Sequence, residues 1–178
     1  MKKILTREEE AQAQPLSATK KILVAYFSRS GKTRKTANKI HESVGGNIFE
    51  IVIVDPYPNG YDEVVKQAKQ ELEEGYGPEL ETKVENMESY DVVFIQLSYL
   101  VGYNAHAGCN VFVEIRFFRK TIVPFCTHEG SHLGRTVTDI TKLCPQSTIL
   151  DGLAVRGRDV KNGQNEVSEW LHEGLFYR

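Results

Sequence analysis

One segment restricts the possible folds more than any other. Residues 21–27 read Lys-Ile-Leu-Val-Ala-Tyr-Phe and are apolar after the first residue. A strand with one side in water alternates polar and apolar residues, so an unbroken run indicates a strand covered on both faces. A polar loop follows directly, and residues Thr33–Val44 then carry apolar side chains at helical spacing. This order predicts a buried parallel strand that leads into a helix.

Strands and helices alternate along the rest of the chain. Apolar runs predict further strands at Asn47–Val54, Tyr90–Ile95, Lys120–Cys126 and Thr148–Val155. Amphipathic spacing predicts further helices at Tyr61–Glu74, Leu133–Leu143 and Glu166–Leu175. Residues Ala105–Phe118 are poor helix formers, but a parallel strand pair needs a crossover, so we expect a helix there too. The alternation predicts an α/β fold with a parallel sheet between two layers of helices.

The length and composition suit one domain. A chain of 178 residues with a hydrophobic fraction of 40% can bury one core, and no linker or repeat interrupts it. Residues 1–19 become charged and polar after the first two lysines. We therefore expect a flexible N-terminal arm at residues 1–19 and one domain at residues 20–178.

Charge and hydropathy argue against several classes of partner. The net charge of -2 provides no strong field for nucleic acid or for an anionic membrane. No apolar run has the length of a membrane span or of a signal peptide, so we expect a cytoplasmic protein. Cys109, Cys126 and Cys144 are widely spaced, and His106 and His132 lack the regular spacing of metal ligands. We therefore expect buried free thiols, with no metal site and no disulfide.

The loop after the first strand carries the groups that a phosphate requires. It consists of Ser28, Arg29, Ser30, Gly31, Lys32 and Thr33. Free amides at a helix start, hydroxyl donors and nearby cations favour an anion there, and a glycine lets the backbone approach it. Tyr26 stands where the nucleoside-triphosphate P-loop needs a glycine, and the dinucleotide motif needs three glycines where only Gly31 is present. The alternative, a helix cap without a ligand, is less favoured because ligands tend to bind at this turn of an α/β sheet.

Three blocks of the sequence resemble the flavodoxin family, in particular its short bacterial flavodoxin-like branch. They are Ala25–Thr33, Lys120–Ser131 and Leu133–Arg135, and the likeness extends over residues 20 to 175. The resemblance implies a three-layer, doubly wound parallel sheet of five strands in the order 2-1-3-4-5. It also implies flavin mononucleotide (FMN) as the cofactor, lying across the carboxyl ends of the strands with its phosphate at Ser28 to Thr33.

By the same resemblance, two further loops would line the flavin ring. The first comprises Thr127, His128, Glu129, Gly130 and Ser131, and the second includes Ser98, Tyr99, Leu100 and Gly102. The second loop departs from its relatives, which carry proline and tryptophan where this chain has Ser98, Leu100 and Val101. Tyr99 or Tyr103 could supply the missing aromatic face, or both could simply pack against neighbours.

The resemblance leaves two activities open. One is electron transfer to a redox partner protein, and the other is FMN-dependent reduction of a small acceptor such as a quinone, with NAD(P)H as a possible donor. The near balance of 22 basic and 24 acidic residues is unlike a strongly acidic shuttle. His128 and Glu129 are better interpreted as flavin contacts than as proton donors, so no catalytic residue is assigned. The segment Arg156–Arg158 is better interpreted as an ordinary charged loop than as a site for a phosphorylated partner. The alternative from another class is a binding module of this fold that has lost or weakened flavin binding.

Overall fold

The structure is a computed structural model that describes residues 20–28, 30–58, 60–74, 79–96 and 117–175. The predicted arm at residues 1–19 lies outside these ranges, as do residues 105–116 of the crossover helix predicted at Ala105–Phe118. Phe118 and Arg119 are described, and they form a turn before the next strand rather than the end of a helix.

Strands and helices alternate in the order that the sequence predicts. The strands are β1 (Ile22–Tyr26), β2 (Asn47–Glu50), β3 (Val92–Gln96), β4 (Thr121–His128), β5 (Thr148–Ile149) and β6 (Leu153–Arg156). The helices are α2 (Lys32–Val44), α3 (Tyr61–Glu73), α5 (Thr136–Leu143) and α6 (Gln164–Leu175), with a short 3-10 helix at Met87–Ser89. None of the helices in the described ranges is long and apolar enough to cross a membrane.

The strands form one parallel sheet in the order β2-β1-β3-β4-β5, and β6 also pairs with β4. This confirms the predicted fold and strand order. Every residue of β1 and of β3 is buried. A strand in the middle of a parallel sheet loses water on both faces, and this explains why the apolar runs in these strands do not alternate.

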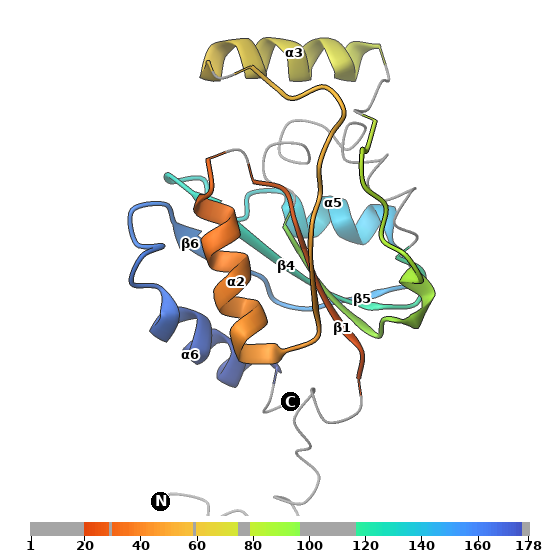
Figure 1. Ribbon diagram of the computed structural model, residues 1–178, viewed down its shortest axis with the longest axis vertical. Helices are drawn as coiled ribbons and strands as arrows, with labels where there is room; N and C mark the ends of the chain where they lie inside the picture. The colour runs from red at the N-terminus through yellow and green to blue at the C-terminus, as the bar shows by residue number, and fades with distance from the viewer. Residues whose placement is uncertain (1–19, 29, 59, 75–78, 97–116, 176–178) are drawn as a thin grey trace, which may run out of the picture.

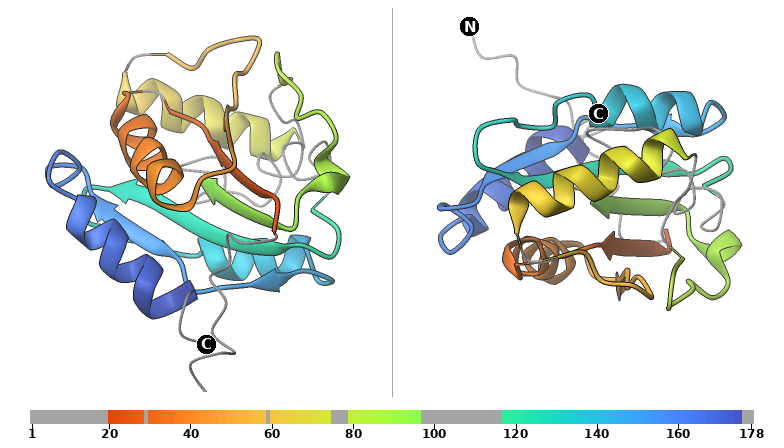
Figure 2. Two further views of the ribbon diagram at one scale, coloured as in Figure 1. Left: turned by 60° about the horizontal axis from the view of Figure 1, so that its bottom comes forward. Right: turned by 90° about the horizontal axis from the view of Figure 1, so that it is seen from above.

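Helices cover both faces of the sheet (Figures 1 and 2). Two apolar clusters, one on each face, hold these layers together. On one face, Ala37 and Ile40 of α2 and Val167 and Leu171 of α6 pack against β1, β3 and β4. Ile140 of α5 belongs to the cluster on the opposite face, which also includes Val64 of α3. Successive strand residues supply the two clusters in turn, as the pleat requires.

The second strand is shorter than the predicted Asn47–Val54. Its ladder with β1 ends at Glu50, apart from one further hydrogen bond from the Ile51 amide to the Tyr26 carbonyl (2.7 Å). Residues 52–54 instead form hydrogen bonds with residues 79–81. The amide of Val54 donates to the carbonyl of Glu79, and the amide of Glu81 donates to the carbonyl of Val52, both at 2.9 Å. The β-branched residues after Glu50 are thus paired, but with a segment that the sequence pattern did not identify.

The predicted fifth strand, Thr148–Val155, is divided into β5 and β6. Ile122 of β4 pairs with Ile149, and Phe125 pairs with Leu153, so two residues of β4 face three residues of the other segment. The extra residue makes this a bulge. Pro124 lies in β4 opposite the interruption and has no amide hydrogen to donate, which favours a break in the ladder at this point.

The fourth strand extends two residues beyond its predicted end, so that Thr127 and His128 lie in β4 rather than in a loop. Pairing with β6 explains the extension, because His128 aligns with Arg156 there. The helix predicted to begin at Leu133 starts at Thr136 instead. The turn before it contains His132 and Gly134, both with positive φ angles (51° and 50°), a backbone conformation incompatible with helix.

Two adjacent glycines between α2 and β2 provide a matched test of this packing. Gly45 and Gly46 have φ angles of 71° and 83°. A Cβ on Gly45 would meet nothing within 4 Å, whereas one on Gly46 would overlap the carbonyl oxygen of Ile22 and lie 2.9 Å from the carbonyl carbon. Gly45, with a ψ angle of -155°, lies in a region that only glycine adopts readily, so Gly45→Ala should lower the free energy of unfolding by about 1–3 kcal/mol through backbone strain alone. Gly46→Ala should cost a further ~1–3 kcal/mol because β1 must move. Urea denaturation measures both, and equal losses would contradict the close approach of Gly46 to β1.

Candidate functional site

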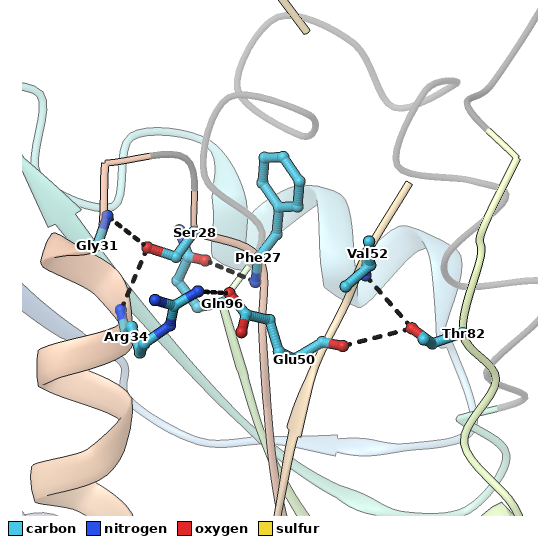
Figure 3. A network of polar contacts seen from close by, with 8 residues as sticks. All are labelled: Phe27, Ser28, Gly31, Arg34, Glu50, Val52, Thr82 and Gln96. Atoms are coloured by element: carbon cyan, nitrogen blue, oxygen red, sulfur yellow. Dashed lines mark hydrogen bonds and ion pairs between the residues drawn. The ribbon is translucent and has the colours of Figure 1, made fainter. Parts of the chain in front are cut away.

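Polar side chains gather at the carboxyl end of the sheet, around the start of α2. They come from the loop after β1, the end of β3, the end of β4 and the segment after β6. Parallel strands bring their carboxyl ends to one edge, so segments far apart in the sequence meet there. Figure 3 shows the part of this site nearest β1.

Ser28 caps the start of α2. Its Oγ accepts hydrogen bonds from the amides of Gly31 (3.1 Å) and Arg34 (3.3 Å) (Figure 3). A hydroxyl group has two lone pairs and one hydrogen. Both lone pairs are used here, so the part of Ser28 that can serve a ligand is its hydroxyl hydrogen. The predicted cap and the predicted donor are therefore compatible roles of one side chain.

Gly31 precedes the helix with a φ angle of 78°, a left-handed conformation that favours glycine. A Cβ added to it would meet no atom within 4 Å. The backbone at this turn therefore borders open space at the positive end of α2. This is the arrangement in which a helix start accommodates an anion.

Two contacts join the first turn of α2 to the end of β4. The hydroxyl groups of Thr33 and Thr127 lie 2.9 Å apart, and Thr33 is buried. Lys32 Nζ lies 2.6 Å from Glu129 Oε1, and both side chains are substantially exposed, at 48% and 69%. Hydrogen bonding to Lys32 is the main cause that lowers the pKa of the Glu129 carboxyl below its usual value. The predicted phosphate loop and the predicted flavin loop are thus in direct contact.

A second ion pair holds the other flank of the loop. Arg34 Nη2 lies 2.6 Å from Glu50 Oε1 at the end of β2 (Figure 3). Tyr26 is buried beside this pair, and burial is the main cause that raises the pKa of its hydroxyl group. The basic side chains at positions 32 and 34 therefore both have acidic partners within the chain.

Gln96 is a site residue that the sequence analysis missed. It ends β3 beside Tyr26 and is fully buried. Its Oε1 accepts a hydrogen bond from the amide of Phe27 (3.3 Å), whereas its Nε2 has no partner among the described residues (Figure 3). A buried donor without a partner is costly, so native proteins rarely keep one without a reason. A polar residue directly after the apolar run Val92–Ile95 was the available signal.

His128 faces the opposite side of β4 from Thr127. Its side chain is buried at 8% exposure, and its Nδ1 has no partner within the described part of the chain. The rings of His128 and His132 lie 4.3 Å apart at an angle of 34°. Burial is the main cause that lowers the pKa of His128, and the positive charges of His132 and Arg156 lower it further. His128 is therefore a neutral imidazole at neutral pH.

Cys126 Sγ donates a hydrogen bond to the carbonyl of His132 (3.2 Å). Burial raises the pKa of Cys126 to about 11, and it raises the pKa of Cys144 to about 11 as well. Both are free and buried, as expected, and neither is a thiolate at neutral pH. Cys109 lies outside the described residues. No group of three or more potential metal ligands occurs in the described ranges.

The structure brings some of the predicted site residues together and not others. One edge of the sheet holds six that contact one another or adjoin in sequence: Ser28, Gly31, Lys32, Thr33, Thr127 and Glu129. Ser30, Gly130 and Ser131 are exposed beside them, and His128 is buried against His132. Arg29, Ser98, Tyr99, Leu100 and Gly102 lie outside the described residues, so the contribution of the third loop stays a prediction. Gly157, which the sequence analysis assigned to an ordinary charged loop, also belongs to the site, because its amide donates to the His128 carbonyl (2.8 Å).

Comparison with known proteins agrees with this architecture. A family profile described as flavodoxin matches residues 21–174. This is almost the full range over which the sequence resemblance was identified. No curated protein matches the chain at a significant level.

Three solved structures are similar over most of the chain. A provisionally assigned flavoprotein from Bacteroides eggerthii has 30% identity and a TM-score of 0.70, with 87% of this chain and 98% of that chain covered. Another, from Bacteroides uniformis, has 24% identity and a TM-score of 0.71, covering 86% and 98%. A flavoprotein from Lactobacillus acidophilus, solved in complex with FMN, has 20% identity and a TM-score of 0.65, covering 81% and 98%. At such identities the last two establish similarity of fold only.

The lowered pKa of His128 makes a prediction about stability. Because the folded pKa lies below the unfolded value of about 6.5, the unfolded chain takes up this proton first as the pH falls. The contribution of His128 to stability should therefore be complete above the unfolded pKa and decline as the pH falls from there towards the folded pKa. His128→Gln should lose less stability than the wild type between about pH 7.5 and pH 5.5 in urea denaturation.

A second variant separates the causes. His132→Gln removes the neighbouring positive charge and should raise the pKa of His128 in an NMR titration of the imidazole. A His128 that titrates at its unperturbed value in the wild type would contradict the burial described above.

Proposed function

The chain belongs to the flavodoxin family, and from that premise we propose that it binds FMN, with the phosphate at the start of α2, and passes electrons to a redox partner or to a small acceptor. The observation that carries the proposal is the open, left-handed turn at Gly31. It stands at the positive end of a helix and at the carboxyl edge of the sheet. The FMN complex of the similar flavoprotein from Lactobacillus acidophilus also supports this cofactor.

The groups around this turn fit a phosphate monoester. The Arg34 amide is taken by Ser28, so a phosphate at this helix start would rely on the amides of Lys32 and Thr33, with the Ser28 hydroxyl hydrogen as a further donor. Lys32 is the nearest cation, although it carries Glu129 as its partner. Charged acceptors form stronger hydrogen bonds than neutral ones, so this set favours a dianion over an uncharged group.

The other residues of the edge would hold the flavin ring. Glu129, Gly130 and Ser131 are exposed after β4, in the loop where the family resemblance places the ring, and Glu129 contacts Lys32 at the start of α2. Gln96 Nε2, a buried donor with no partner among the described residues, lies at the same edge of the sheet. FMN supplies reversible one- and two-electron chemistry when bound. The chain's part is to bind and orient it and to limit its access to water.

Electron transfer and reduction of a small acceptor remain the two forms of the proposed activity. The charge balance of 22 basic and 24 acidic residues argues against a shuttle steered by a strongly acidic surface. This favours a small acceptor over a protein partner, and NAD(P)H is the donor to test. Burial lowers the pKa of His128, which disfavours the imidazolium form that it would need to act as a general acid towards such an acceptor.

The cofactor proposal is tested by titrating the purified chain with FMN and with riboflavin, which lacks the phosphate. We expect FMN to bind at least about tenfold more tightly, because two charge-assisted hydrogen bonds account for more than ~1.4 kcal/mol. Quenching of flavin fluorescence measures both dissociation constants. Equal affinities would show that the start of α2 does not recognise the phosphate. A chain that takes up neither flavin would instead support the binding-module alternative.

The activity is tested on the FMN-loaded chain. We expect it to oxidise NAD(P)H only when a quinone is added. The absorbance of the reduced nicotinamide measures this oxidation. FMN-free chain is the matched control. If NAD(P)H does not reduce the bound flavin but a chemical reductant does, the result would favour a shuttle that accepts electrons from a protein donor.

A further inference from the structure

The ion pair between Lys32 and Glu129 lies beside the proposed phosphate site, at the first residue of α2. Lys32 begins α2, and Glu129 follows β4, so the 2.6 Å contact spans two segments that are 97 positions apart in the sequence. The neighbouring contact between Thr33 and Thr127 fixes the spacing of the same two segments. The side chains at positions 32 and 129 are thus brought together by the sheet edge and not by a local turn.

Gly157 bounds the other side of this pair. Its amide donates to the carbonyl of His128, so the segment after β6 is held against the end of β4. A Cβ at Gly157 would overlap Glu129 Oε1 and would lie 3.0 Å from Lys32 Nζ. A side chain at this position would therefore require the Glu129 carboxylate, the end of a flexible and exposed side chain, to move. The glycine leaves room for the pair as it stands.

A carboxylate and a phosphate compete for the same ammonium group. Lys32 is the cation at the first position of α2, and Glu129 supplies the chain's own anion to it. A phosphate monoester that uses Lys32 must share the three N–H donors of the ammonium group with this carboxylate or displace it, and in either case two negative charges lie close together. An uncharged ligand at the same place would have no reason to disturb the pair.

From this arrangement we propose that Glu129 is a specificity-determining residue, which holds Lys32 in the free protein and limits how strongly the site prefers a phosphorylated flavin over an unphosphorylated one. The inference rests on the proposed function, because it assigns a role to Glu129 within the same site. The ligand class that responds to it is a phosphate monoester. The sequence analysis placed Glu129 at the flavin ring and gave it no role towards the phosphate.

The test is Glu129→Gln, which keeps the size of the side chain and removes its charge. Both flavins are titrated against the full chain at low ionic strength, where exposed charges are least screened. We expect the dissociation constant for FMN to fall about two- to fivefold relative to that for riboflavin, the range typical of one exposed charge pair. The ratio is the readout because a contact of Glu129 with the flavin ring would affect both ligands alike. Glu42→Gln is the matched control, since Glu42 is an exposed residue on α2, more than two turns from its start. Its FMN affinity should equal that of the wild type.

A double-mutant cycle with Lys32→Gln distinguishes a role through Lys32 from a general effect of charge. If Glu129 acts by occupying Lys32, the gain from Glu129→Gln should shrink in the Lys32→Gln background. A gain of the same size in both backgrounds would overturn the role through Lys32.

The possible failures are distinguishable. If the wild-type chain binds FMN but Glu129→Gln leaves the ratio of FMN to riboflavin affinity unchanged or lowers it, this inference is overturned. The proposed function then stays intact. A wild-type chain that binds neither flavin overturns the proposed function and this inference with it.

Discussion

Burial of the central strands on both faces is the constraint on which the rest of the structure depends. Every residue of β1 and β3 is buried, and β4 is nearly so. Helices must then cover each face, and the crossovers that supply them make the strands parallel. Parallel strands end at one edge, so the loop after β1 and the end of β4 become neighbours. The contact between Thr33 and Thr127 is a direct result.

The same edge holds several polar groups whose demands are only partly met within the chain. Lys32 and Arg34 have acidic partners, and Ser28 uses both of its lone pairs to cap α2. Gln96 Nε2 and His128 Nδ1 are buried and lack partners among the described residues. A core without function would replace such groups with apolar ones. The retention of Gln96 at the edge that also carries the open turn at Gly31 is consistent with a site that is completed by a ligand, and the ion pairs show what the ligand must compete against.

Much of the fold could be predicted because it rests on local patterns. The apolar runs located the central strands, and helical spacing located α2, α3 and α6 within a few residues. The predicted strand bounds were wrong where pairing with a distant segment decides how far a strand extends. Residues 52–54 pair with residues 79–82 instead of extending β2, and the fifth strand breaks opposite Pro124. Neither partner is visible in the residues of the segment itself, because pairing depends on what the fold brings alongside.

The order of the strands was implied by the resemblance to the flavodoxin family. The sequence by itself determined the layers and the turn at Ser28 to Thr33, since burial, helix capping and glycine conformation act over a few neighbouring residues. It also identified Glu129, but only as a residue near the flavin ring. The tertiary structure decided that Glu129 contacts Lys32, that Gly157 bounds the pair, and that Gln96 is buried at the same edge. These are contacts between segments that are distant in the chain. Their distances depend on the register and twist of the whole sheet, which no single segment specifies.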